Sequence, residues 1–228
     1  RAVAGPDFTY TAAGVVSGLA PSSGQRGTVV TISGERLLGG ASDASVVLLG
    51  GEAATVVTAN ATEVVVEASN GTAGVGDVEI ESTSGAIVRG ENAWEQLEEG
   101  RITSVTPDSG VSGTRVTVRG TSLFGGSTGL AVVTLNGVAA NITGTPSDTE
   151  VVVVANDAGA GSGAVELTAL SGAVVSAGGS FEYLEPANVT LVTPSSGQVG
   201  TRLEVRGERL PGPGRPSVSA ADGGPRGG

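Results

Sequence analysis

The stretch "PSSGQRGTVVTISGERLLGG" at residues 21–40 decides the fold, because similar stretches occur three times in the chain. A close copy, "PDSGVSGTRVTVRGTSLFGG", begins at Pro107, and a third, "PSSGQVGTRLEVRGERLPGP", begins at Pro194. The copies start 86 and 87 residues apart. A pattern that returns at a nearly constant period is typical of tandemly repeated units. The sequence therefore predicts a serial array in which each copy opens one unit.

The composition favours strands. The chain of 228 residues has 39 glycines, 3% aromatic residues and many valines and threonines. β-Branched side chains are better accommodated on a pleated surface than in a helix, and glycines supply turns with positive φ. No segment keeps an apolar period of 3.6 residues, so we expect helices to be few and short. These features predict an all-β fold.

The second copy shows the expected strands most clearly. In residues 114–120 two valines alternate with outward-facing Arg and Thr side chains. Pro107 cannot donate to a ladder and belongs at a sheet edge, while Asn136 and Gly137 are typical of a hairpin turn. The expected strands lie at 102–110, 114–120, 130–137, 138–143, 149–155, 163–170 and 173–184. About seven strands with turns at this spacing predict an immunoglobulin-like β-sandwich.

The first copy repeats this series. Its expected strands lie at 27–33, 44–51, 53–58, 62–68, 76–82 and 86–97. Within 76–82, Val78 and Ile80 point inward, and the acidic residues beside them face water, where charge keeps strand edges from pairing. Trp94 and Phe181 hold equivalent positions, and we expect both to pack in the core or at a junction between units.

These motifs, taken together, resemble the IPT/TIG family. The chain has Pro-x-Ser-Gly-x-x-Gly-Thr, an alternating strand ending in Gly, a Gly-Gly turn, V-x-L-x-G-x-x-A, "TEVVV" and a closing F-x-Y. The resemblance covers about residues 15–99 and 101–185, and part of a third unit from Val189. It implies immunoglobulin-like domains such as those shared by plexins, transcription factors and many surface proteins. It does not by itself imply one function, because function depends on sites.

The resemblance also predicts the domain organisation. Residues 8–10 ("FTY") align with residues 181–183 ("FEY"), and residues 215–228 align with the middle of the first unit. We therefore expect the last strand of a preceding repeat at 1–14, IPT/TIG domains at 15–99 and 100–187, and an incomplete third domain at 188–228. Such a chain looks cut from a longer array. In an alternative, the N-terminal strand completes a neighbour's unfinished C-terminal unit by strand addition.

The junctions between units are short. Only "EQLEEG" follows Trp94, and only "LEPAN" follows Tyr183, before the next unit begins. Short junctions restrict flexing, so neighbouring sandwiches should touch. The sequence therefore predicts a semi-rigid rod.

The chain lacks two residue types on which many catalytic sites depend. It has no His and no Cys, which excludes Ser-His and Cys-His pairs and thiolate metal sites. Two-carboxylate glycosidase chemistry stays formally open, but the carboxylates fall on strand faces and short turns. Asp43, Asp108 and Asp157 are candidates for weak calcium binding between domains, although a turn Asp bonding its own backbone is the simpler interpretation. We predict no enzyme activity, no cofactor and no metal site.

Charge and hydropathy limit the partners. The net charge is −11, whereas phosphate-binding surfaces need clustered cations. Arg115, Arg119, Arg202 and Arg206 alternate along strands beside acidic residues, which indicates surface ion pairs. No run of about 20 apolar residues occurs. The sequence therefore predicts neither nucleic-acid binding nor a membrane span in this stretch.

Four of the seven asparagines stand in Asn-x-Thr triplets, namely Asn60, Asn70, Asn141 and Asn188. Each is expected in a turn, at an edge strand or at a domain junction, where a bulky N-linked glycan fits. Coincidence in a Thr-rich chain is the alternative. If the sites are used, the protein passes through a eukaryotic secretory route and is extracellular or at the cell surface.

The preferred hypothesis is an extracellular structural protein, a glycosylated tandem array that forms a filament, stalk or surface coat and can self-associate. The alternative is a cell-surface adhesin or receptor ectodomain that recognises protein or carbohydrate, although its short loops hold few of the Tyr, Trp and Arg anchors typical of binding sites. An accessory domain beside a polysaccharide-acting enzyme is a third hypothesis.

Overall fold

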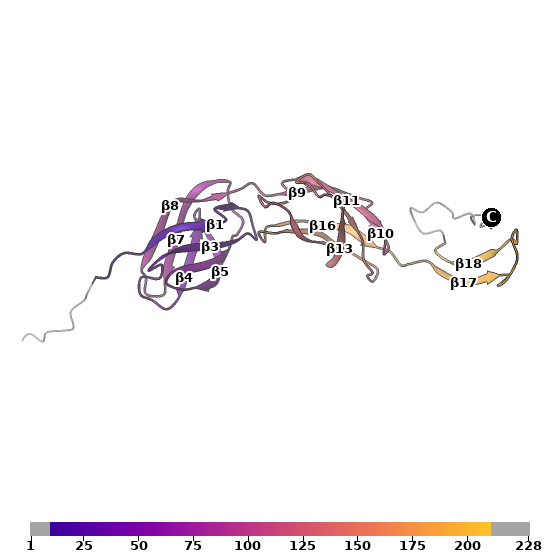
Figure 1. Ribbon diagram of the computed structural model, residues 1–228, viewed down its shortest axis with the longest axis horizontal. Coiled ribbons are helices and arrows are strands. Elements are labelled where there is room, and N and C mark those ends of the chain that lie inside the picture. The colour runs from indigo at the N-terminus through magenta and orange to yellow at the C-terminus, as the bar shows by residue number, and fades with distance from the viewer. Residues whose placement is uncertain (1–9, 211–228) are drawn as a thin grey trace, which may run out of the picture.

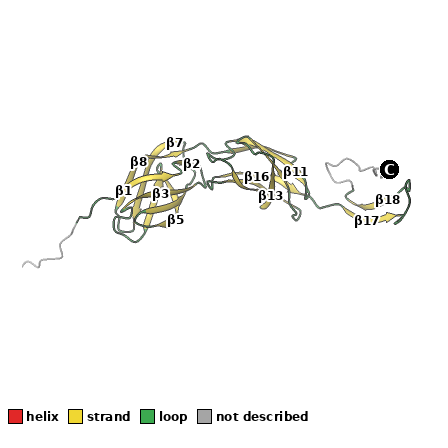
Figure 2. Ribbon diagram, in the orientation of Figure 1, coloured by secondary structure: helices red, strands yellow, loops and turns green. Residues whose placement is uncertain are grey.

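Strands, turns and loops make up the part of the chain that the computed structural model describes, residues 10–210 (Figure 2). No helix long and apolar enough to span a membrane occurs among these residues. The predicted all-β class is therefore confirmed. The part of the expected preceding strand that holds Phe8, and the aligned segment 215–228, lie outside the described residues.

The first sandwich, unit 1, has eight strands in the order β1-β3-β6-β5-β4-β7-β8-β2. They are β1 (Val15–Ala20), β2 (Ser23–Gly24), β3 (Val29–Glu35), β4 (Ala44–Leu49), β5 (Glu52–Ala59), β6 (Glu63–Glu67), β7 (Gly74–Ser82) and β8 (Ile87–Gln96).

The second sandwich, unit 2, has the matching order β10-β16-β15-β12-β13-β14-β11-β9. Its strands are β9 (Arg101–Thr106), β10 (Ser109–Gly110), β11 (Arg115–Thr121), β12 (Leu130–Leu135), β13 (Val138–Thr143), β14 (Glu150–Val154), β15 (Gly161–Ala169) and β16 (Val174–Tyr183). A hairpin of β17 (Asn188–Thr193) and β18 (Glu204–Glu208) follows. Figure 1 shows the two sandwiches end to end.

One strand in each unit belongs to both layers. The first three residues of β5 pair with β4, and residues 55, 56, 58 and 59 pair with β6 around a bulge. β13 divides in the same way between β12 and β14. The tight turn before β13 has positive φ at Asn136 and Gly137, as the sequence predicted. This shared strand joins the two layers of each sandwich.

The first strand of each unit changes layer at a proline. β1 ends at Ala20 and pairs with β3, whereas β2 begins at Ser23 and pairs in parallel with β8. In unit 2, β9 ends just before Pro107 and lies last in the strand order. Because proline has no N–H to donate, the ladder stops there. The predicted edge position of Pro107 is confirmed.

Alternating valines build the two cores. In β11, Val116 and Val118 are fully buried while Arg115 and Arg119 are exposed. Each buried valine side chain contributes about 1.5–3 kcal/mol relative to an exposed one. Of the four arginines predicted to form surface ion pairs, Arg119 pairs with Glu150 and Arg206 pairs with Glu204, both at 2.6 Å. No ion pair of Arg115 or Arg202 is found among residues 10–210.

The last strand of each unit closes its core with a different pair. In unit 1, Trp94 Nε1 donates to Gln96 Oε1 at 3.0 Å, and both residues are buried. In unit 2, the rings of Phe181 and Tyr183 meet edge to face, with centroids 5.1 Å apart. Trp94 and Phe181 therefore lie in the cores. The Tyr183 hydroxyl is buried without a hydrogen-bond partner, and desolvation raises the pKa of this side chain.

We expect Tyr183→Phe to keep or raise the free energy of unfolding at pH 7, by up to about 1 kcal/mol, because the lost hydroxyl has no partner. Above about pH 10 the unfolded wild type loses this proton before the folded state does, so wild-type stability falls as pH rises and the variant loses less. Urea unfolding followed by circular dichroism at both pH values measures this difference. A destabilisation above about 1 kcal/mol at pH 7 would show that the hydroxyl has a partner.

Candidate functional site

The candidate site is the junction between unit 1 and unit 2, where several hydrogen bonds join the two units. Four residues, 97–100, connect β8 to β9. The turn before β3 in unit 1, at residues 25–29, meets the turn before β16 in unit 2, at residues 171–174. The junction thus joins segments that are far apart in the sequence.

Two backbone hydrogen bonds hold these turns together. The Val29 N–H donates to the Ser171 carbonyl oxygen at 2.8 Å, and the Val174 N–H donates to the Arg26 carbonyl oxygen at 3.0 Å. The bonds run in opposite directions between the units, as in an antiparallel ladder. They fix the position of one turn along the other.

The side chain of Gln25 connects unit 1 to two segments of unit 2. It is fully buried, its Nε2 donates to the Val174 carbonyl oxygen at 3.1 Å, and its Oε1 accepts the Gly100 N–H at 2.6 Å. Within its own turn, the Gln25 N–H donates to Thr28 Oγ1 and the Thr28 N–H donates back to the Gln25 carbonyl oxygen. A buried amide with both ends bonded is stabilising, whereas an unpaired one is costly.

Two glycines allow the turns to approach each other. Gly27 and Gly172 have φ values of +85° and +89°. A Cβ on Gly27 would lie 2.8 Å from the Gly172 carbonyl oxygen, and a Cβ on Gly172 would lie 2.7 Å from the Gly27 carbonyl oxygen. Their counterparts, Gly113 and Gly85, have similar φ but no atom within 4 Å of such a Cβ. Steric need for glycine on both sides is therefore specific to this junction.

A pair of adjacent glycines in unit 2, Gly125 and Gly126, lies against Gln25 and the linker. A Cβ on Gly125 would lie 2.8 Å from Gln25 Cδ, and a Cβ on Gly126 would collide with Leu97 of the connecting segment. Unit 2 therefore receives both the glutamine and the linker at two adjacent residues that have no side chains.

The four predicted glycosylation residues are all exposed but are not brought together. Asn60 lies between β5 and β6, Asn70 lies between β6 and β7, Asn141 lies in β13, and Asn188 begins β17. Asn60 Oδ1 accepts hydrogen bonds from the N–H and the hydroxyl of Thr62, at 2.9 and 3.0 Å. The asparagines are thus separate surface positions.

The candidate calcium residues do not form a cluster. Asp43 Oδ1 accepts the N–H of Ala44 at 2.8 Å, the local bond expected of an Asp in a turn. Asp108 accepts the Glu182 N–H through its carbonyl oxygen, and Asp157 lies in the loop after β14. Among residues 10–210, no group of three or more His, Cys, Asp and Glu side chains could hold a metal ion.

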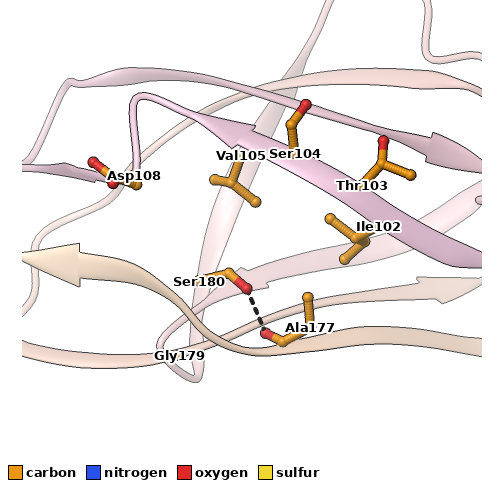
Figure 3. A pocket seen from close by; sticks show the side chains of 8 residues that line it. All are labelled: Ile102, Thr103, Ser104, Val105, Asp108, Ala177, Gly179 and Ser180. Carbon is orange, nitrogen blue, oxygen red and sulfur yellow. Dashed lines mark hydrogen bonds between the residues drawn. The ribbon is translucent and has the colours of Figure 1, made fainter.

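An open surface depression of about 290 Å³ lies between β9 and β16 of unit 2 (Figure 3). Thr103, Ser104, Asp108 and Ser180 supply its polar atoms, and the Ser180 hydroxyl donates to the Ala177 carbonyl oxygen at 3.0 Å. Unlike a ligand cleft, it has no aromatic wall.

The junction residues were not identified from the sequence as functional. A signal is present, because the repeated turn reads Gln25, Val111 and Gln198 at equivalent positions. A single glutamine in a polar turn cannot be distinguished from an ordinary exposed residue. The difference between glutamine and valine at this position becomes informative only when the three copies are compared.

We expect Gly27→Ala and Gly113→Ala each to lower the free energy of unfolding by about 1 kcal/mol, because alanine is strained at a positive φ. Only Gly27→Ala should also loosen the junction, because its Cβ would clash with the Gly172 carbonyl oxygen. The chain has no cysteine, so Val57→Cys and Ser162→Cys place one spin label on each unit. The interlabel distance distribution should broaden in Gly27→Ala and stay narrow in Gly113→Ala. Equal distributions in the two variants would contradict this role.

Gln25→Val should lower the free energy of unfolding of unit 1 by about 1–3 kcal/mol, because the Gly100 N–H and the Val174 carbonyl oxygen lose their partner. The single tryptophan, Trp94, reports this transition through its fluorescence in urea. The matched change Gln198→Val, in an exposed turn, should stay within about 0.5 kcal/mol. Indistinguishable midpoints for the two variants would rule out the stabilising role.

Comparison with known proteins places the chain in a family. The model of the IPT/TIG domain matches residues 15–92 and 101–183. A search of the curated proteins finds no match.

The solved structures that this chain matches include a plexin extracellular region and a bacterial SGBP-B protein. The full extracellular region of plexin A4, domains 1 to 10, aligns at 21% identity with a TM-score of 0.49, over 89% of this chain and 18% of that chain. The SGBP-B protein from a complex xyloglucan utilization locus of Bacteroides uniformis aligns at 17% identity with a TM-score of 0.33, over 75% of this chain and 49% of that one. The chain therefore spans about a fifth of the plexin and half of SGBP-B. The two matched segments of the family model, each on its own β-sandwich, show that this chain belongs to the IPT/TIG family.

Proposed function

We propose that this chain is an extracellular structural protein in which serial IPT/TIG units form a stiff rod, used as a stalk, surface coat or filament. The observation that supports this most is the junction, where the buried Gln25 amide and the opposed Gly27 and Gly172 hold two units in one orientation. A contact of this kind contributes length and stiffness to an array.

The surface suits a hydrated rod. The net charge is −11, and acidic side chains such as Glu79 and Glu150 lie on outer strand faces in exposed ion pairs with arginines. Like charges on successive units keep the rods soluble and limit edge-to-edge pairing of strands. The proposed function uses no cofactor, no nucleic acid and no catalytic centre.

N-linked glycans fit this function. Asn60, Asn70, Asn141 and Asn188 are exposed on the two sandwiches and the hairpin, so bulky sugars at these positions would not enter a core. Use of these sites would require passage through a secretory route, which supports the proposed extracellular location.

Recognition of a protein or carbohydrate, as in an adhesin or receptor ectodomain, is the second candidate. The depression between β9 and β16 favours it, because Thr103, Ser104 and Ser180 supply hydroxyl groups that can hydrogen-bond a polar ligand. The proposal ranks second because no aromatic anchor lines the depression.

We expect glycosidase treatment to lower the intact mass of material from the native source. When this chain is expressed through a eukaryotic secretory route, its mass should exceed the 22.0 kDa of the bare chain, and each Asn→Gln change at residues 60, 70, 141 and 188 should remove one glycan. Asn92→Gln, exposed and outside any Asn-x-Thr triplet, is the matched control and should leave the mass of the attached sugar unchanged.

A native mass that glycosidase treatment leaves unchanged would overturn the glycosylated surface protein. The same result together with specific retention of one sugar or protein on an array would favour the recognition module instead.

A further inference from the structure

The chain has two Asn-Gly dipeptides, Asn70-Gly71 and Asn136-Gly137. Asparagines are among the thermolabile residues of proteins. In an Asn-Gly dipeptide the backbone nitrogen of the glycine can attack the side-chain carbonyl carbon of the asparagine, because glycine has no side chain to hinder the approach. The attack needs an unbonded asparagine side chain, an unbonded N–H after it and a backbone that can move. The surroundings of each dipeptide therefore decide whether it reacts.

Asn136-Gly137 is held in its turn. The two residues have φ values of +50° and +76° and connect β12 to β13. Asn136 is partly buried, its Nδ2 donates to the Gly161 carbonyl oxygen at 3.2 Å, and its N–H donates to the Ala164 carbonyl oxygen at 2.8 Å. To bring this side chain onto the Gly137 nitrogen, the turn must give up these contacts.

Asn70-Gly71 has no such contacts. It belongs to the loop between β6 and β7, and Asn70 is exposed. The residue before it is still bonded, because the Ser69 hydroxyl donates to the Ala53 carbonyl oxygen. Among residues 10–210, neither Asn70 nor Gly71 takes part in a hydrogen bond. Both reacting groups of this dipeptide are therefore unrestrained.

Unit 2 has a carboxylate where unit 1 has this asparagine. In the repeat, Asn70 corresponds to Asp157, and Gly71 corresponds to Ala158. Asp157 is exposed in the loop between β14 and β15. An acid at this position is compatible with the fold, so conversion of Asn70 to aspartate does not require unit 1 to rearrange.

We propose that Asn70 is a site of spontaneous modification, at which the asparagine of the bare chain becomes aspartate or isoaspartate. The Gly71 nitrogen bonds to the Asn70 side-chain carbonyl carbon, the bond from that carbon to Nδ2 breaks, and ammonia leaves with the proton of the Gly71 N–H. Water then opens the cyclic imide. Attack of water at the side-chain carbonyl carbon gives aspartate, and attack at the backbone carbonyl carbon gives isoaspartate. A negative charge thereby replaces a neutral amide.

The nitrogen that leaves is the one to which an N-linked glycan is attached, because residues 70–72 form an Asn-x-Thr triplet. A sugar on Nδ2 crowds the side-chain carbonyl carbon and replaces ammonia by a bulkier leaving group. Of the four triplets, only this one places glycine after the asparagine. The glycan at Asn70 therefore also preserves the amide, and this part of the inference rests on the proposed glycosylation.

The bare chain, made in bacteria without N-linked glycans, tests the modification itself. After incubation at mildly alkaline pH, peptide mass spectrometry should show loss of the amide at residue 70 about tenfold or more faster than at residue 136, because reaction at Asn136 must first break the hydrogen bonds of its turn. An isoaspartate assay should give a signal from the same peptide. Asn60, exposed but followed by alanine, is a second internal control and should keep its amide.

Gly71→Ala is the matched variant, and it keeps the Asn-x-Thr triplet. Gly71 does not have a positive φ, and its added Cβ lies 3.1 Å from Glu52 Cγ and 3.3 Å from Gln96 Cδ, so small shifts of these two side chains admit it. The methyl group hinders attack by the neighbouring nitrogen, so loss of the amide at residue 70 should slow while loss at residue 136 is unaffected. The fluorescence of the buried Trp94 checks that unit 1 is folded. Equal rates at residues 70 and 136, or a rate at residue 70 that Gly71→Ala leaves unchanged, overturn the proposal.

Chains made through a eukaryotic secretory route test the role of the glycan. Thr72→Ala removes the triplet but keeps Asn70-Gly71. Under the same incubation the wild-type chain should keep its glycosylated Asn70, and the Thr72→Ala chain should lose this amide as fast as the bare chain does. Sugars are trimmed before mass spectrometry with an endoglycosidase that leaves the first sugar on the asparagine, because cleavage at the asparagine itself would produce aspartate.

The two parts of the inference fail separately. Equal loss of the amide in the secreted wild-type and Thr72→Ala chains overturns the protective role of the glycan. A secreted wild-type chain without a glycan at Asn70 overturns both that role and the proposed glycosylation of this position. Neither result changes the comparison of Asn70 with Asn136 in the bare chain, which alone decides the spontaneous modification.

Discussion

The buried amide of Gln25 is the interaction on which the arrangement of the two units depends. Its two ends bond the Gly100 N–H and the Val174 carbonyl oxygen, so a rotation of one unit against the other leaves at least one buried polar group unpaired. The cost of such a group, about 1–3 kcal/mol, is large compared with the weak forces that otherwise orient neighbouring domains. The four-residue linker keeps the two units close to each other. A buried polar contact therefore constrains the orientation of unit 1 relative to unit 2.

The rest of the junction depends on the close approach of two backbone turns that have no side chains between them. Positive φ at Gly27 and Gly172 lets two turns approach closely enough for main-chain bonding, and any side chain there would strike the opposite carbonyl oxygen. The same glycine positions recur in units where no neighbour touches them. A turn that already needs glycine for its own φ is thus suited to contact, since no further change of sequence is required. Because each unit repeats this glycine-containing turn, each unit can form the same kind of contact with its neighbour.

Much of the fold could be predicted from the sequence, because its strands have one buried and one exposed face. The alternation of Val116 and Val118 with arginines, and the Asn136 turn, each reflect a local constraint that does not depend on other domains. The division of β5 between two layers was not predicted, since it is decided by which neighbours the strand meets. The burial of Gln25 was missed for a related reason: in unit 1 alone this side chain would be a polar group on an outer turn.

The short parallel pairing of β2 with β8 has a mechanical consequence. Tension along the chain enters each sandwich near its first strand and leaves by its last, at opposite ends. β2 and β8 run in the same direction, and their bonds, the Glu95 N–H to Ser22 and the Leu97 N–H to Gly24, lie across that pull. Equivalent bonds join Glu182 to Asp108 and Leu184 to Gly110. A stretched molecule must shear these bonds together rather than unzip them one at a time, which makes each sandwich resist extension until it yields abruptly.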